Sequence, residues 1–296
     1  MSADRVEIRK SSRSATDPRA DCPFLATLLT MWTFGAGGLS PCDALPLHEH
    51  TSHAPRPRKT HPARPRLGGS RGSRDTISPA LAQAREVIIL ELPGHGQAPA
   101  QTDSGTFEGL ARSLDIWLVK ENLIGIDMVG SSLGARLVLE MARRGRAGSV
   151  VALDPGGFWQ GWERERTFFR TTITASIALV RALRPALPAL TRNVTGRTGF
   201  MLQLSARPCA PDPGFVLNEL QSFADTPTFD SLVKDLATGP MQEGPATRST
   251  RVVIGRGRKD RPCLPQQASR AKAAYPEATM HWFERSGHFP MWDRPD

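Results

Sequence analysis

The sequence predicts an α/β protein with a mostly parallel sheet, helices on both faces of that sheet and an inserted helical segment. Three observations predict it. Short runs rich in β-branched residues alternate with longer stretches that carry apolar residues at helical spacing. The apolar run Ile126–Val129 leads through a glycine- and serine-rich turn straight into such a stretch. Residues 156–246 lack strand patterns and interrupt the alternation. Because parallel strands need crossover connections, usually helices, the alternation favours a parallel sheet.

The predicted elements follow one another in a regular order. Apolar runs of strand length lie at Glu86–Glu91, Gly125–Val129, Val150–Leu153, Arg251–Ile254 and Thr279–Phe283. Amphipathic stretches of helix length lie at Asp75–Ala84, Phe107–Asn122, Leu133–Arg144 and Leu264–Tyr275. Residues 67–155 and 247–296 therefore form the predicted core, which is within the usual size of a single domain. We find no internal repeat.

The inserted segment 156–246 reads as helical. Amphipathic patterns predict helices at Trp162–Leu183, Phe215–Phe223 and Phe229–Leu236. Pro185 and Pro188 are expected to end the first of them, because proline lacks the N–H that a helix interior needs.

The N-terminal segment 1–66 differs in composition from the rest of the chain. His48 to Arg66 is rich in Pro, His, Arg and Lys, so it cannot bury enough apolar surface to offset the entropy cost of ordering, and we expect disorder. Seven basic residues and no acidic one lie between Arg56 and Arg74, which places much of the net charge of +9 there. This run has no aromatic residues between its cations, and we expect no nucleic-acid partner. The histidines at 48, 50 and 53 lack an orienting scaffold, so we expect no metal site.

Three interpretations of segment 1–66 remain open. Pro23–Leu39 is uncharged and follows basic residues, as in a signal sequence or anchor, but Asp17 and Asp21 interrupt the approach and no small-residue cleavage site follows. The segment is alternatively a genuine tail, or sequence foreign to the rest through a shifted reading frame or misassigned start. Since the uncharged run is short for a membrane span, we expect no stable membrane insertion and, by default, a cytoplasmic protein. The four cysteines share no metal or redox spacing.

The pentapeptide Gly130–Gly134 lies between a predicted strand and a predicted helix. In that context Gly-x-Ser-x-Gly indicates a nucleophile, here Ser132, on a strained turn. We expect Gly130 and Gly134 to be required because a Cβ at either position would clash. The helix that follows offers free N–H groups to developing negative charge. The alternative is an ordinary turn between strand and helix.

A serine nucleophile needs a base, and the base needs an orienting carboxylate. Asp260 follows the fourth predicted strand and His288 follows the fifth. Asp260 lies among several basic residues, so a solvated surface charge is its alternative role. Asp154, directly after the third strand, is a rival acid, although Asp-Pro is also an ordinary way to open a turn. His288 is alternatively a loop histidine without a task.

From Leu67 to the end, the chain resembles the α/β-hydrolase superfamily. Four motifs in sequence carry the resemblance: Leu92–Gly96 (LPGHG), Gly130–Gly134 (GSSLG), Gly257–Arg261 (GRKDR) and Ser286–Pro290 (SGHFP). The resemblance implies that Ser132 is the nucleophile, Asp260 the acid and His288 the general base. It also implies that the insertion is a helical cap, and that no cofactor is needed. An apolar wall over Ser132 would then come from aromatic and Met side chains that otherwise serve cap packing: Phe158, Trp159, Phe168, Phe169, Phe200, Met201, Phe223 and Met241.

The oxyanion donors are the point at which the chain departs from this family. One donor is expected to be the N–H of Leu133, directly after the nucleophile. The other matches Leu67, in the segment Leu67-Gly-Gly-Ser70. The apolar strand ending in His-Gly that should precede it is absent, with Pro65-Arg66 in place of the pair. We therefore expect an impaired oxyanion site.

The resemblance implies a serine hydrolase that acts on small-molecule carboxylic esters with an apolar acyl or alcohol group. Related acyl-transfer, perhydrolase or carbon–carbon hydrolase activity uses the same triad and is the alternative. A truncated, catalytically silent protein is a further alternative. Strands before Leu67 and a last helix after Asp296 are expected to be missing, and the sheet surface uncovered there predicts self-association.

Overall fold

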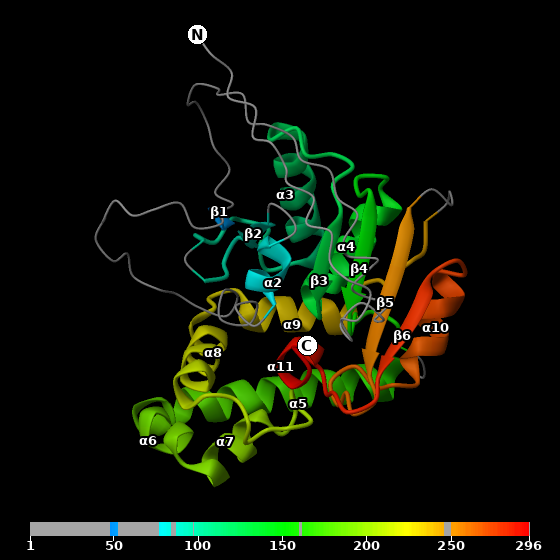
Figure 1. Ribbon diagram of the computed structural model, residues 1–296. Coiled ribbons are helices and arrows are strands. Elements are labelled where there is room, and N and C mark those ends of the chain that lie inside the picture. The colour runs from blue at the N-terminus through cyan, green and yellow to red at the C-terminus, as the bar shows by residue number, and fades with distance from the viewer. Residues whose placement is uncertain are drawn as a thin grey trace, which may run out of the picture.

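The computed structural model has the α/β architecture that the sequence predicts (Figure 1). It describes residues 48–52, 77–83, 87–96, 98–159, 162–245 and 250–295. The main sheet consists of four parallel strands in the order β3 (Met128–Ser131), β4 (Ser149–Leu153), β5 (Arg251–Gly257) and β6 (Thr279–Phe283). Each strand pairs with the next one along the chain, so all carboxyl ends meet at one edge of the sheet.

The two central strands, β4 and β5, are buried on both faces of the main sheet, where successive side chains of a strand point to opposite sides. Val150 and Ala152 of β4 belong to the larger apolar cluster, together with Val252 and Ile254 of β5. The residues between them, Val151, Leu153 and Val253, belong to a second cluster on the other face. Apolar runs without polar alternation, as read in the sequence, are what strands buried on both faces require.

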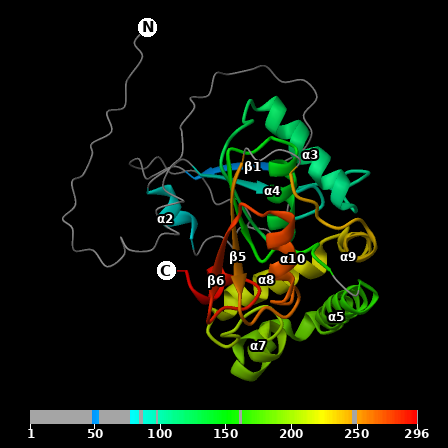
Figure 2. The same ribbon diagram turned by 90° about the vertical axis from the view of Figure 1, so that its right-hand side faces the viewer.

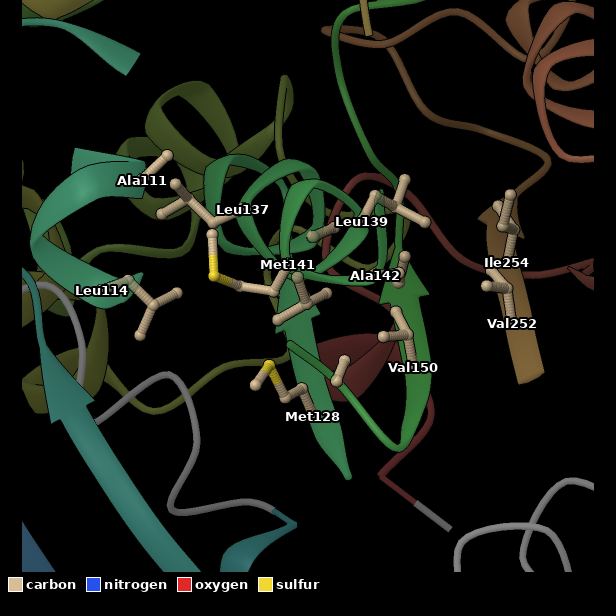
Figure 3. Close-up of a cluster of buried hydrophobic side chains, with 14 of the residues drawn as sticks. Ala111, Leu114, Met128, Leu137, Leu139, Met141, Ala142, Val150, Val252 and Ile254 are labelled. Atoms are coloured by element: carbon tan, nitrogen blue, oxygen red, sulfur yellow. The ribbon is translucent and has the colours of Figure 1, made fainter. Parts of the chain in front are cut away.

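Three helices cover the first face. They are α3 (Phe107–Lys120), α4 (Leu133–Arg143) and α10 (Gln267–Ala274), and Figure 2 shows them on one side of the sheet. Helix α4 packs directly against β3 and β4, and its buried side chains include Leu137, Leu139 and Met141. Figure 3 shows Leu137 and Met141 on the side toward Ala111 and Leu114 of α3, in the same cluster as the strand residues Met128, Val150, Val252 and Ile254. Burying each such Leu or Met stabilises the fold by about 1.5–3 kcal/mol. This packing holds α4, and the turn directly before it, in place against the sheet.

On the second face of the sheet, the covering elements are shorter. Met291 of α11 (Pro290–Asp293) packs in the cluster with Val151, Leu153 and Val253, and Ile77, next to α2 (Ser78–Ala82), lies against it. The four-residue α11 therefore covers part of this face.

Strand β2 (Val87–Glu91) differs from the prediction, which placed it in the parallel sheet. It pairs antiparallel with β1 (His48–Ser52), with His48 opposite Glu91, and these two form a separate sheet among the described residues. The expected disorder of segment 1–66 is thus wrong for His48–Ser52, because strand β2 supplies hydrogen-bond partners for the backbone of this piece. The remainder of 1–66, including the signal-like Pro23–Leu39, lies outside the described residues.

The insertion between β4 and β5 is helical, and Figure 1 shows its helices beyond the carboxyl ends of the strands. The helices are α5 (Trp162–Ala182), α6 (Leu187–Arg192), α7 (Val194–Met201), α8 (Pro213–Asp225) and α9 (Phe229–Thr238). The sequence did not predict α6 and α7. Pro185 and Pro188, read as helix ends, lie in the first turns of a 3-10 turn (Arg184–Ala186) and of α6, where proline is tolerated because that N–H needs no partner.

Among the described helices, none is by itself long and apolar enough to cross a membrane. Residues Glu165–Ala182 and Arg184–Arg192 pass that test of length and composition only as a pair, which is bent by 69°.

Candidate active site

Ser132 lies at the turn between β3 and α4. Its backbone has φ 54° and ψ −114°, a conformation that non-glycine residues rarely adopt. A Cβ at Gly130 would overlap the backbone of Gly134 and Ala135, so glycine is required at 130. The same expectation for Gly134 is wrong, since a Cβ there would meet no atom within 4 Å. The strain is held by the packed strand and helix on either side, which is a pattern typical of functional turns.

His288 lies in the loop after β6 with its ring directed at Ser132. Nε2 is 2.8 Å from Ser132 Oγ, and Nδ1 is 3.0 Å from Asp260 Oδ1. The backbone N–H of His288 donates to the Leu204 carbonyl at 2.9 Å, which fixes the loop against the insertion. With the proton on Nδ1, the ring donates to Asp260 and accepts from the serine hydroxyl. His288 is only 3% exposed, so it is not a solvated loop histidine.

Asp260 lies in the loop after β5 and is 3% exposed, which excludes a surface charge. Its Oδ1 accepts from His288 Nδ1 and from the Cys263 N–H at 2.9 Å. Burial alone would raise the pKa of this carboxyl. The charge and hydrogen bond of His288, with the cation of Arg256, nevertheless bring the pKa of Asp260 below its usual value. The group is therefore an anion at neutral pH.

Asp154, the rival acid, lies at the end of β4 and is fully buried. Its Oδ1 accepts from the Gly257 N–H at 2.9 Å, and it makes no hydrogen bond to His288 among the described residues. Burial, followed by the nearby charge of Asp260, raises the pKa of Asp154 well above its usual value. The sequence favoured Asp260 and left Asp154 as the alternative acid; the geometry places Asp260, and not Asp154, against the imidazole.

The expected oxyanion donors are the backbone N–H groups of Leu133 and Leu67. Leu133 is the first residue of α4, and the first N–H groups of a helix have no acceptor within that helix. Its backbone therefore lies where a negative charge next to Ser132 would be stabilised. Leu67 lies outside the described residues.

The expected wall residues pack in several different places. Trp159 is buried and meets the ring of Phe169 at a tilt, with ring centroids 5.0 Å apart. Phe158 packs instead into the main core against Tyr275, and Met201 is buried among the insertion helices. Phe168 is 48% exposed and Met241 is 42% exposed, so neither packs into a wall.

Sequence reading missed Asp293, which holds the loop that carries His288. Its Oδ2 accepts from the Gly287 N–H at 2.7 Å and from the Ala206 N–H at 2.9 Å, and its Oδ1 accepts from Ser205 Oγ at 2.5 Å. One buried carboxylate thus joins α11, the histidine loop and the segment after α7. No local pattern marks it, because its partners come from two distant segments.

Within the described part of the chain, one group of residues has donor atoms close enough to hold a metal ion. Asp260, Cys263 and His288 place one such atom each within 4.8 Å of one another. Two of these atoms already hydrogen-bond each other, and burial raises the pKa of the Cys263 thiol well above its usual value, so that it stays protonated. This chemistry does not suit a metal, which needs the thiolate.

Comparison with solved structures returns the same fold at low identity. A putative lipase from Acinetobacter baumannii is 20% identical with a TM-score of 0.60, and the match covers 77% of this chain and 76% of that one. An esterase from Exiguobacterium antarcticum is 14% identical with a TM-score of 0.61, covering 83% and 89%. A meta-cleavage product hydrolase from Pseudomonas fluorescens is 14% identical with a TM-score of 0.55, covering 76% and 82%.

No curated protein matches the chain. A protein-family model, described as the alpha/beta hydrolase family, matches residues 67–296, which is the range over which the four motifs occur. The chain belongs to the alpha/beta hydrolase family.

Proposed function

We propose that this protein is a serine hydrolase that cleaves carboxylic esters through an acyl-enzyme on Ser132. The observation that carries the proposal is the unbroken series of two hydrogen bonds, Ser132 Oγ to His288 Nε2 and His288 Nδ1 to Asp260 Oδ1. All three residues lie at the carboxyl edge of the parallel sheet, on loops that the packed core fixes.

Each residue has one task in the proposed reaction. His288 Nε2 takes the hydroxyl proton as Ser132 Oγ attacks the ester carbonyl carbon, and the imidazolium then returns that proton to the leaving alcohol. A water molecule, deprotonated by the same nitrogen, attacks the acyl-enzyme, and the imidazolium returns this proton to Ser132 Oγ as the acid leaves. Asp260 keeps the proton on Nδ1 and stabilises the imidazolium without taking the proton itself.

The proposed oxyanion donors are the N–H groups of Leu133 and Leu67. Losing one such donor typically costs about 2.7–4 kcal/mol of transition-state stabilisation. With the Leu133 N–H as its single oxyanion donor, the enzyme would be slow. The kcat for ester hydrolysis therefore indicates whether the Leu67 N–H also binds the oxyanion.

We propose an apolar acyl or alcohol group in the substrate, and no cofactor. Trp159 and Phe169 form the aromatic surface that supports this choice. Two of the structurally similar proteins, the lipase and the esterase, are named for ester hydrolysis. The second candidate is carbon–carbon bond hydrolysis, which the similarity to the meta-cleavage product hydrolase favours and which would use the same three residues.

A substrate panel tests the proposal. The wild-type protein is assayed with p-nitrophenyl esters of increasing acyl length, with a carbon–carbon substrate, and with esters in the presence of peroxide. Ester hydrolysis that is absent in Ser132→Ala supports the proposal. Turnover only of the carbon–carbon substrate supports the second candidate, and no turnover by a folded protein supports a catalytically silent scaffold.

A further inference from the structure

Asp154 lies next to Asp260 and is held in one orientation. It follows β4 with a φ of 48°, its backbone N–H donates to the Gly255 carbonyl at 2.8 Å, and its Oδ1 accepts from the Gly257 N–H at 2.9 Å. Asp154 and Asp260 lie within hydrogen-bonding reach of each other, and both are buried. The site therefore contains a second carboxyl group to which the proposed mechanism gives no role.

Each of these carboxyls has one oxygen atom without a partner. Asp154 Oδ2 and Asp260 Oδ2 are both buried and accept no hydrogen bond from any described residue. Two carboxylates that share a buried site cannot both ionise readily, because their charges repel and neither is solvated. A single proton between the two groups removes the repulsion and gives both oxygens a partner.

The other charged and titratable groups that face Asp154 decide how many protons are present. Arg256, fully buried, donates to the carbonyls of Pro155, Cys263 and Leu264, and its Nε lies 3.9 Å from Asp154 Oδ1. The Cys263 thiol stays neutral because burial raises its pKa. One arginine cation balances one carboxylate, so a neutral cluster requires that one of the two acids keep its proton.

The hydrogen bonds decide which acid is ionised. Asp260 accepts from both His288 Nδ1 and the Cys263 N–H, whereas among the described residues Asp154 accepts only from the Gly257 N–H. Donors stabilise the charged form, so Asp260 carries the charge. The opposite pKa shifts of the two groups agree, upward for Asp154 and downward for Asp260.

We infer that Asp154 is a protonated carboxylic acid whose hydroxyl donates a hydrogen bond to Asp260 Oδ2, and so turns Oδ1 toward His288. In terms of catalysis this inference rests on the proposed function and makes Asp154 a positioning residue. It gives Asp260 a donor for each oxygen, keeps the buried cluster neutral, and lowers the tendency of Asp260 to take the imidazolium proton.

The protonation state is read directly by infrared spectroscopy, without any need for activity. In a Ser132→Ala background at neutral pH, the difference spectrum against Ser132→Ala/Asp154→Asn is expected to contain the carbonyl stretch of one un-ionised carboxylic acid. A carboxylate band in its place would show that Asp154 is ionised and would overturn the inference, whether or not the protein is a hydrolase.

The positioning role is read by two replacements of the same residue. Asparagine can donate from its amide nitrogen to Asp260 and still accept from the Gly257 N–H, so Asp154→Asn is expected to keep kcat within about two-fold. Leucine has similar size and no donor, and loss of a hydrogen bond to a charged group predicts a kcat at least about ten-fold lower. KM should stay constant in both variants, and circular dichroism checks that both are folded.

The pH profile of kcat/KM separates a neutral Asp154 from an ionised one. If it is neutral, Asp154→Asn leaves the buried charge unchanged, and the acid limb stays where it is in the wild type. If it is ionised, the same change removes a negative charge beside the imidazole, disfavours its protonated form and moves the acid limb to lower pH. A shift of that kind, or equal losses in the Asn and Leu variants, would contradict the inference.

Discussion

Asp293 Oδ2 accepts a hydrogen bond of 2.7 Å from the backbone N–H of Gly287, the residue directly before His288. The same carboxylate binds Ser205 and Ala206, in the segment of the insertion that follows α7. The Leu204 carbonyl in that segment accepts the His288 N–H. The loop that carries the proposed base is therefore built together with the insertion, and its position depends on contacts far from the nucleophile.

Replacing Asp293 by Ala should destabilise the fold and lower kcat. Asp293 is 1% exposed, and removing its carboxylate takes an acceptor from the N–H groups of Gly287, Ala206 and Arg207 and from the Ser205 hydroxyl, which predicts a loss of about 3 kcal/mol. Urea unfolding measures the loss. Asp212 is the matched control, because it also accepts two backbone N–H groups but at an exposed helix start, where Ala should cost only about 1 kcal/mol. Equal losses in the two variants would contradict the proposed support of the His288 loop.

Replacing Gly257 by Ala should displace the same loop from the other side. A Cβ at Gly257 would overlap the carbonyl oxygens of Ser286 and Gly287, both backbone atoms that cannot rotate away. We expect a lower unfolding free energy and a large drop in kcat. Gly134→Ala is the control: its Cβ meets no atom within 4 Å, and alanine favours a helix over glycine by about 1 kcal/mol, so stability should be kept or raised. The account fails here if Gly257→Ala is as stable and active as the wild type.

The identity of the acid can be tested by paired substitutions. Asp260→Asn should lower kcat by about 10⁴-fold, because it favours the wrong imidazole tautomer. Asp154→Asn should have little effect, since Asp154 does not contact the imidazole. His288→Ala should nearly abolish turnover. The kcat of each variant is measured by steady-state kinetics with one ester. A larger loss of kcat in Asp154→Asn than in Asp260→Asn would make Asp154 the acid.

The parts of the fold that local patterns could predict are the strands and helices around the nucleophile. A continuous apolar run predicted β4 to within one residue, because a buried strand needs side chains that are apolar on both faces. The shorter strand pattern at Thr279–Phe283 predicted the limits of β6. Helix α4 was predicted from its periodicity to within one residue of its end. The positions of Ser132, Asp260 and His288, each after a strand of the sheet, followed from motif and order, which depend on short stretches of chain.

The parts that could not be predicted depend on which segments meet in space. The proline-rich start of α6 reads as a helix end unless the residues that follow are known to pack. The pairing of β2 with β1 depends on a partner with no apolar pattern. Asp293 and the contact between Asp154 and Asp260 join loops whose proximity only the folded sheet creates. For the same reason, the sequence wrongly required glycine at position 134, where the space is open.

The central claim is that Ser132 is an activated nucleophile. It is tested most directly by treating the purified, folded protein with a fluorophosphonate probe and mapping the modified peptide by mass spectrometry. The account predicts one covalent adduct on Ser132, absent in Ser132→Ala and strongly reduced in His288→Ala. An unlabelled protein that circular dichroism shows to be folded would contradict it, as would labelling that persists in Ser132→Ala.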